Sequence, residues 1–395
     1  MSRKRVLIVG GGFAGIKAAL ELSKDKRLQV SLLSNRPTFR FYPNLYTTVT
    51  GGLPEESSIP LDSILGDKPI RIIIGEAVQL DRKERTIITS RIDSYRYDIL
   101  IMSLGVVTNF NGIKGIEQYA FSIKSVEEVV RFKAHLHQQL IDDHKPDLHY
   151  VIVGGGPTGV ELAGVLPGYI REIMGKHGIQ HKAIHIDLVE AEPRLMLNIV
   201  KKETSDKITK RLHQLGIKLH VGKIVQGETA NSLRFDGHPI TTHSVVWTAG
   251  VTNHPFFKVN NFAINSNGKV TVDGHMQAEQ NIYVLGDNAD TPYSGMAQTG
   301  LHDAMYVSSY IINLLDNKKT ADYKPEKPVY IIPVGPHWAA VQWGNVQLYG
   351  WIGWLLRKTV RLQAFHYYEP WWRVTEQWIK EFETVETCPV CASRM

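Results

Sequence analysis

Two stretches of the chain share one pattern and decide its fold: RVLIVGGGFAGIKAALEL at residues 5–22 and HYVIVGGGPTGVELAGVL at residues 149–166. Each begins with apolar, mostly β-branched residues, continues with G-x-G-x-x-G, and then places apolar residues at helical spacing. This order predicts a buried strand, a tight glycine turn and a helix, which together open a dinucleotide-binding βαβ unit. Because the pattern occurs twice, we predict an α/β protein with two Rossmann-like domains and two nucleotide sites.

The three glycines of such a motif have different tasks. The first makes the tight turn, the second lets the backbone approach a pyrophosphate, and the third lets the helix pack closely on the strand. The pyrophosphate then lies at the positive end of the helix. The glycines with these tasks are Gly10, Gly12 and Gly15 in the first copy, and Gly154, Gly156 and Gly159 in the second.

The residue that ends the next strand normally binds the adenosine ribose. In IHIDLVEAEPRL this residue is Glu190, whose carboxylate would accept a hydrogen bond from the 2′-hydroxyl and repel a 2′-phosphate, so NADH is favoured over NADPH. In the first copy the position holds Ser34, followed by Asn35. A neutral group there replaces a charge-assisted bond of roughly 1.5–3 kcal/mol by one of roughly 0.5–1.5 kcal/mol.

Composition indicates an ordinary globular protein with more than one domain. The 395 residues are 43% hydrophobic and 21% charged, and the net charge is +6. Basic residues are spread along the chain without a recognition-helix or RNA-binding pattern, so we do not expect nucleic acid as a partner. The longest apolar run near the end has nine residues, 348–356, against the roughly 20 needed to span a bilayer. With no secretory signal at the start, we expect a cytoplasmic protein.

The two cysteines lie together near the end, at Cys388 and Cys391, so no disulfide framework is expected. Their C-x-x-C spacing suits half of a zinc site, but the chain has no second pair and a zinc site needs four ligands. We therefore predict no metal and interpret the pair as free or oxidised thiols in a tail. A zinc ion shared between two subunits is the alternative.

Further segments resemble those of flavoproteins with two dinucleotide domains. In QNIYVLGDNADTP, residues 280–292, Asp287 matches the aspartate that holds the FAD ribitol, although it could instead cap a helix. Residues 97–115 and 244–251 resemble the paired connectors that lead out of the FAD domain and back. We therefore expect a discontinuous FAD domain at 1–115 and 245–325, an inserted NADH domain at 116–244, and a C-terminal region at 326–395.

The order and spacing of these segments, together with FYPNLYTTVTGGL at 41–53 and MAQTGLHDA at 296–304, resemble the type II NADH dehydrogenases over nearly the whole chain. These are single-subunit NADH:quinone oxidoreductases. The resemblance implies FAD as cofactor, NADH as substrate and a membrane quinone as acceptor, without proton pumping. The cofactor-binding residues that it implies are Gly10, Gly12, Phe13, Ala14, Gly15, Ser34, Asn35, Val78, Gly105, Gly286, Asp287, Gln298, Gly154, Gly156, Thr158, Gly159, Glu161, Glu190, Ala249 and Gly250.

The resemblance also implies three catalytic residues. Glu161 matches a glutamate near the nicotinamide and the flavin, and we expect it on the first turn of its helix, where the helix dipole alone could favour a carboxylate. The quinone motif of the family has two glutamines four residues apart. Gln298 matches the first, but His302 stands in place of the second. We hypothesise that His302 donates a proton to the reduced quinone, since histidine titrates near working pH.

Cysteine usage separates the related enzymes. Disulfide reductases, sulfide:quinone oxidoreductases and the related peroxidases need a reactive thiol, and residues 1–387 contain none. The reduced flavin must then pass its electrons directly to a quinone or to a small redox protein. A reductase of a small iron–sulfur protein and a redox-responsive binding flavoprotein are therefore the alternative functions.

Seven of the eight tryptophans lie between residues 338 and 378. Residues 327–351 read as two short strands around Gly335 and Gly344, and a helical pattern follows Gly350. Its apolar positions are Trp351, Trp354, Leu355 and Leu362, flanked by Arg357, Lys358 and Arg361. Tryptophan and basic side chains favour an anionic membrane surface. We predict peripheral attachment to the cytoplasmic face through residues 347–380. Packing on the nucleotide domains or in a homodimer interface is the alternative.

Overall fold

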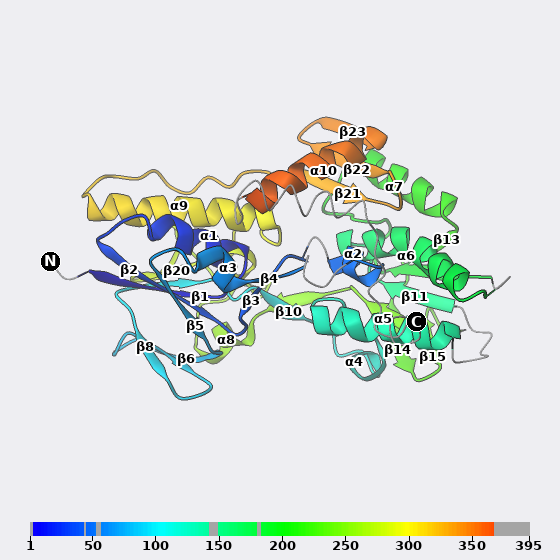
Figure 1. Cartoon of the computed structure of the whole chain (residues 1–395), viewed down its shortest axis with the longest axis horizontal. Coiled ribbons are helices and arrows are strands. Elements are labelled where there is room, and N and C mark those ends of the chain that lie inside the picture. The colour runs from blue at the N-terminus through cyan, green and yellow to red at the C-terminus, as the bar shows by residue number, and fades with distance from the viewer. Residues whose placement is uncertain (1–2, 43–44, 53–56, 142–148, 180–182, 367–395) are drawn as a thin grey trace. The chain divides into compact units, whose positions relative to one another are not determined.

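The computed structural model describes residues 3–42, 45–52, 57–141, 149–179 and 183–366, and Figure 1 shows their arrangement along the chain. The chain forms two compact units. The first comprises residues 1–40, 58–107 and 251–328, and the second comprises 41–57, 108–250 and 329–395. Residues 329–366, which belong to the C-terminal region that we expected as a separate part from residue 326, group with the second unit.

The first unit is built on a six-stranded sheet in the order β19-β20-β9-β1-β2-β5. Only β19 is antiparallel to its neighbour. The central strands are almost fully buried, as parallel strands are when elements cover both faces of the sheet. The strands are β1 (Lys4–Val9), β2 (Leu28–Ser34), β5 (Ile70–Ile74), β9 (Ile99–Met102), β19 (Gln277–Glu279) and β20 (Ile282–Val284).

Two helices of the first unit pack against each other beside this sheet: α1 (Phe13–Leu22), which follows β1, and α9 (Ala297–Leu315), as Figure 1 shows. An antiparallel three-stranded meander, β6-β7-β8, inserts before β9. Its strands are Ala77–Asp81, Thr86–Thr89 and Ser94–Arg96. The remaining elements are β3 (Thr38–Arg40), β4 (Ser58–Pro60), α3 (Leu61–Leu65), β18 (Val251–Asn253), α8 (Pro255–Val259) and the 3-10 turn η3 (Gly286–Asn288).

The second unit repeats the plan of the first with a four-stranded parallel sheet in the order β13-β12-β11-β17. The strands are β11 (His149–Val153), β12 (His185–Glu190), β13 (Ile217–Val221) and β17 (Ser244–Trp247). A meander of β14 (Val225–Thr229), β15 (Ser232–Phe235) and β16 (His238–Thr241) again precedes the last strand. The helices are α2 (Leu45–Val49), α4 (Ile116–Tyr119), α5 (Val126–Ile141), α6 (Pro157–Lys176) and α7 (Lys202–Gln214).

The repetition extends to single hydrogen bonds at the glycine turns. The N–H of Gly10 donates to Leu33 O and that of Gly154 to Val189 O, both at 2.8 Å. Both glycines have positive φ, 118° and 114°, which a residue with a side chain rarely adopts. The structure thus confirms the predicted α/β fold with two Rossmann-like units. The strand β10 (Val106–Thr108), in the connector between them, pairs with β18.

The C-terminal region forms an antiparallel sheet of three strands, β21 (Tyr330–Pro333), β22 (Ala339–Trp343) and β23 (Val346–Gly350), followed by α10 (Trp351–His366). The prediction of two strands was wrong, because Gly335 and Gly344 each turn the chain at positive φ, 74° and 57°, and so separate three strands. The helix begins where predicted. Among the described residues, no helix is both long and apolar enough to cross a bilayer.

Candidate functional site

The glycine turn of the first unit leaves one side of its backbone open. A methyl group at Gly10 would lie 2.1 Å from Ser103 O, and one at Gly15 would lie 1.9 Å from Gly10 O, so both positions require glycine for packing. A methyl group at Gly12 would meet nothing within 4 Å. Gly12 is also the N-cap of α1. The open space beside it, at the positive end of a helix, fits the pyrophosphate of a dinucleotide.

Three small residues bring other segments of the first unit to the start of α1. Methyl groups built at Gly286 and Gly300 would lie 3.6 and 3.5 Å from the Ala14 side chain. The turn η3, which contains Asp287, and the first turns of α9, which contain Gln298, therefore meet the N-terminal turn of α1. The first unit thus gathers these predicted FAD residues in one place, with two helices that begin there.

Other predicted FAD residues lie on different elements of the first unit. Phe13 packs edge to face against Phe39, with ring centroids 4.9 Å apart. Val78 is exposed on β6. Gly105, which directly precedes β10, donates its N–H to Asn288 Oδ1 at 2.8 Å. Phe13 and Gly105 are thus held in place by contacts within the unit, and the side chain of Val78 is open to a ligand.

Ser34 and Asn35 differ in what they can offer a ribose. Ser34 is only 2% exposed. Its hydroxyl donates to Arg36 O at 2.8 Å and accepts the N–H of Arg36 at 3.3 Å. Asn35 is exposed, and its Oδ1 accepts from Arg36 Nε at 3.2 Å. The hydroxyl of Ser34 is thus occupied by its own loop, which makes Asn35 the more accessible polar side chain for a ligand.

The second unit has an equivalent open glycine turn. A methyl group at Gly154 would lie 2.7 Å from Thr248 Oγ1, and one at Gly159 would lie 1.9 Å from Gly154 O. A methyl group at Gly156, the N-cap of α6, would meet nothing within 4 Å. Thr158 follows in the first turn of α6. This turn therefore also fits a pyrophosphate.

Glu190 lies across the second glycine turn. Its Oε2 accepts the N–H of Gly155, and its Oε1 accepts the N–H of Glu192 at 2.7 Å. Ser34 has the matching place in the first unit, since a methyl group at Gly11 would lie 2.6 Å from its hydroxyl oxygen. The structure therefore supports the equivalence of Ser34 and Glu190 that the sequence predicts.

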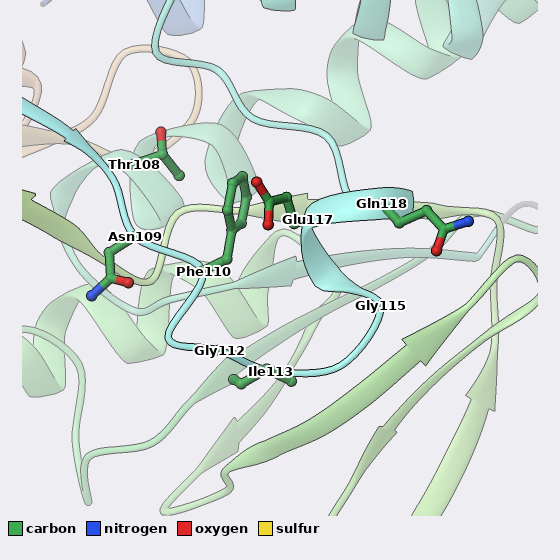
Figure 2. Close-up of a pocket in the computed structure, with 8 residues that line it drawn as sticks. All are labelled: Thr108, Asn109, Phe110, Gly112, Ile113, Gly115, Glu117 and Gln118. Carbon is green, nitrogen blue, oxygen red and sulfur yellow. The ribbon is translucent and has the colours of Figure 1, made fainter.

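The connector loop of the second unit lies beside Ala249 and Gly250. Asn109 accepts from Trp247 Nε1 at 2.8 Å and donates its N–H to Gly250 O at 3.2 Å, and Asn111 Nδ2 donates to Ala249 O at 3.3 Å. The sequence of this loop predicts a connector only, through its resemblance to the connectors of related flavoproteins. Figure 2 shows the depression of about 510 Å³ that it forms, lined by Thr108, Asn109, Phe110, Gly112, Ile113, Gly115, Glu117 and Gln118.

Glu161 is the fifth residue of α6, and the first turn of this helix contains no acidic residue. The expected place on the first turn was therefore wrong, and the helix dipole, which acts mainly within that turn, explains Glu161 less well. Among the described residues, none forms a hydrogen bond or ion pair with it. Burial raises the pKa of Glu161 to about 8, so its carboxyl group is mainly protonated at neutral pH.

Gln298 and His302 both lie on α9, one turn apart, as predicted from their spacing. Gln298 is exposed. The ring of His302 faces the segment after α9: its Nε2 lies 3.0 Å from Lys324 O, its Nδ1 lies 3.7 Å from Glu326 Oε2, and its centroid lies 5.4 Å from that of Tyr323. Proton donation to a quinone by His302 stays a prediction, and it requires one of these ring nitrogens to change partner.

Residues 4–304 match the family model described as pyridine nucleotide-disulphide oxidoreductase. The chain belongs to this family. Its members are FAD enzymes that use a pyridine nucleotide, so the cofactor prediction is confirmed at that level. The open turns at Gly12 and Gly156 are the structural features that fit the two dinucleotides.

Known proteins also resemble the chain over most of its length. A type II NADH:quinone oxidoreductase of Staphylococcus haemolyticus is 25% identical over an alignment 362 residues long, and the match covers 85% of this chain and 88% of that protein. The structure resembles NDH2 of Plasmodium falciparum in complex with NADH, with a TM-score of 0.85, 18% identity and coverage of 96% and 98%. It also resembles the sulfide:quinone oxidoreductase of Aquifex aeolicus, with a TM-score of 0.78, 20% identity and coverage of 90% and 89%. The resemblance expected from the sequence is confirmed.

Proposed function

We propose that the chain is a non-proton-pumping NADH:quinone oxidoreductase that holds FAD in the first unit and NADH in the second. The observation that carries this assignment is the contrast between two otherwise equivalent turns. Glu190 presents a carboxylate across the turn of the second unit, which suits the free ribose hydroxyls of NADH, while the first unit adds Asp287 beside its turn. The relative in Staphylococcus haemolyticus, named for this activity, supports it.

The residues of the chain contribute binding, orientation and charge. Bound FAD would supply a two-electron acceptor for the hydride of NADH and a donor of two electrons to quinone. Gly12 and Gly156 would let the backbone approach each pyrophosphate, Asp287 would hold the ribitol, and Glu190 would orient the adenosine ribose. We assign Glu161 to the nicotinamide and flavin region, where its neutral carboxyl could donate a hydrogen bond. Gln298 and His302 would bind and protonate the quinone headgroup.

The exposed face of α10 supports attachment to a membrane surface. It carries Trp351, Ile352, Leu355, Leu356 and Val360, all exposed and along one stripe of the helix. Trp354 instead packs against His337, with centroids 4.9 Å apart, and does not join the stripe as predicted. An apolar face of this kind suits a lipid interface, where a quinone would enter. The side chains of Leu362 and Arg361, residues 367–380, and the cysteine pair lie outside the described residues.

Two basic residues of α10 lie over aromatic rings. The Arg357 guanidinium is 5.1 Å from the ring centroid of Tyr46, and the Lys358 ammonium is 5.6 Å from that of Trp354. Both therefore place positive charge near the stripe, and positive charge beside a bilayer favours anionic headgroups. We therefore keep peripheral attachment to the anionic cytoplasmic face as part of the proposal. The proposal also includes a homodimer, which analytical sedimentation of the protein would test.

The proposed activity is tested by separating its two half-reactions without oxygen. The FAD-loaded protein is reduced with NADH and then mixed with a short-chain quinone while flavin absorbance is followed. We expect fast reoxidation by quinone and slow reoxidation by a ferredoxin or rubredoxin. His302→Ala is expected to slow reoxidation at least tenfold and to leave reduction by NADH unchanged. Slow reoxidation by every quinone would contradict the proposed acceptor, and rapid reoxidation by an iron–sulfur protein would support the alternative.

A further inference from the structure

The turn that carries Asp287 is tied to the residue before β10 and to the end of β18 by one buried side chain of the first unit. Asn288, which is fully buried, donates from Nδ2 to Gly105 O at 2.6 Å and accepts the N–H of Gly105 at Oδ1 at 2.8 Å. The same Nδ2 lies 2.6 Å from Asn253 Oδ1. Gly105 precedes β10 and Asn253 ends β18, so the Asn288 amide holds the end of η3 beside these two strands.

A buried carboxyl group fixes the beginning of the same turn. Asp303, fully buried on α9, accepts the N–H of Gly286 at Oδ2 at 2.9 Å and the hydroxyl of Tyr323 at Oδ1 at 2.5 Å. Gly286 has φ of 65°, a conformation that favours glycine. The chain of bonds runs from Tyr323 through Asp303 to the residue directly before Asp287.

Tyr323 belongs to a segment, residues 321–326, that returns antiparallel along α9, where Figure 1 shows the chain beside the helix. We name it the return segment. Its attachment does not depend on Asp303, because Tyr306 donates its hydroxyl to Ala321 O at 2.8 Å and Tyr323 donates its N–H to Gly274 O at 2.7 Å. Asp303 is thus not required to keep this segment in place.

Because Asp303 is buried, the loss of either of its two hydrogen bonds would cost free energy. Burial raises the pKa of Asp303 to about 6, although the bonds from Tyr323 and Gly286 act in the opposite direction. A buried N–H that loses its acceptor costs the free energy of its desolvation. Without Asp303, the N–H of Gly286 would have to turn toward another acceptor, and the Leu285–Gly286 peptide group, one residue before Asp287, would turn with it.

We propose that Asp303 and Tyr323 are positioning residues for Asp287: the bond from the Gly286 N–H to Asp303, whose carboxyl group Tyr323 holds, sets the direction in which the Asp287 carboxylate meets the FAD ribitol. Neither residue is assigned a contact with the cofactor. The inference rests on the proposed function only in placing FAD in the first unit. It makes the return segment part of the cofactor site through a hydrogen-bonded chain rather than by contact.

The test measures FAD binding to apoprotein by fluorescence titration, together with the visible absorption of the bound flavin. Asp303→Ala is expected to weaken FAD binding at least roughly tenfold and to shift the flavin absorption bands. Asp303→Asn should restore most of the affinity, because its Oδ1 can accept from Gly286 and its Nδ2 can donate to the Tyr323 oxygen. Tyr323→Phe should weaken binding less than Asp303→Ala.

Two matched variants control for loss of a bond in the same region. Tyr306→Phe removes a hydroxyl that holds the return segment but does not touch Asp303. Asp322→Asn makes the same carboxylate-to-amide change at a neighbouring side chain that is 80% exposed. Both are expected to bind FAD with wild-type affinity and spectrum. If Asp303→Ala and Tyr323→Phe match these controls in affinity and spectrum, the proposal is wrong.

Folding and function are separated by two further measurements. Thermal unfolding of each apoprotein measures how much stability the substitution removes. A positioning role predicts a loss of FAD affinity that is larger than this loss of stability explains. Should Asp303→Ala not fold, Tyr323→Phe with its Tyr306→Phe control decides the matter. A wild-type protein that binds no FAD would overturn the proposed function, whereas FAD binding that these variants leave unchanged would overturn the positioning role alone.

Discussion

Ser34 and Glu190 occupy matching places against Gly11 and Gly155, yet they make different bonds. The sequence predicts the match because the spacing from each glycine motif is local. It does not predict that the Ser34 hydroxyl binds its own loop at Arg36, since short polar side chains near turns compete for backbone partners that a sequence does not identify. The first site therefore lacks the charge-assisted ribose contact that the second site offers.

Glu228 is a buried carboxyl group without a use in the proposed reaction. It is 8% exposed on β14, its Oε2 has no hydrogen-bond partner, and burial raises its pKa to about 8 from an ordinary value of 4.5. The folded protein therefore binds more protons than the unfolded chain between these two pH values. The contribution of Glu228 to stability is most favourable below pH 4.5 and is lost as pH rises toward 8.

Glu228→Gln should remove this pH dependence. We expect the variant to gain stability relative to the wild type as pH rises from 5 to 8, by an amount on the order of 3 kcal/mol. Urea denaturation at several pH values measures the free energy of unfolding. Glu203→Gln, at an exposed position of α7, is the control and should run parallel to the wild type. A Glu228→Gln profile parallel to the wild type would contradict the assigned environment.

At the scale of elements, α10 shows what a helical pattern can and cannot predict. Its start at Trp351 follows from the turn at Gly350, which has φ of 77°, and from the apolar spacing. The pattern could not tell which tryptophan faces outward. Gly353 fixes the orientation, because a methyl group there would lie 2.4 Å from Ala339 O, so α10 packs directly on β22. Such a contact between elements is not contained in a local pattern.

The exposed stripe of α10 should govern membrane attachment. We expect the double variant Trp351→Ser and Ile352→Ser to reduce binding to anionic vesicles at least roughly tenfold, since these side chains are 61% and 55% exposed and each gains apolar burial in lipid. Sedimentation with vesicles measures this binding, and reduction of the flavin by NADH should not change. The exposed pair Ile92 and Val259, changed to serine, is the control. Equal vesicle binding by both double variants would rule out the stripe as the contact surface.

At the scale of the whole molecule, the chain contains one plan twice. In each unit, a strand, a glycine turn and a helix lead to further parallel strands, then to a three-stranded meander and a strand that pairs with the first. The strand, glycine turn and helix that begin each unit were predictable because the glycine motifs are local. The meanders and the grouping of residues 41–57 with the second unit were not, because they depend on pairing between distant segments. The depression of the connector loop was missed for the same reason.

The central claim, FAD in the first unit and NADH in the second, is tested most directly by changing the two matching residues one at a time. The measurement is anaerobic flavin reduction by NADH and by NADPH, with bound FAD determined on the same samples. We expect Glu190→Gln to lower the preference for NADH at least roughly tenfold and to leave the FAD content unchanged. Ser34→Ala should leave the preference for NADH unchanged. A Glu190→Gln protein that loses FAD but keeps its preference for NADH would contradict the assignment of the two sites.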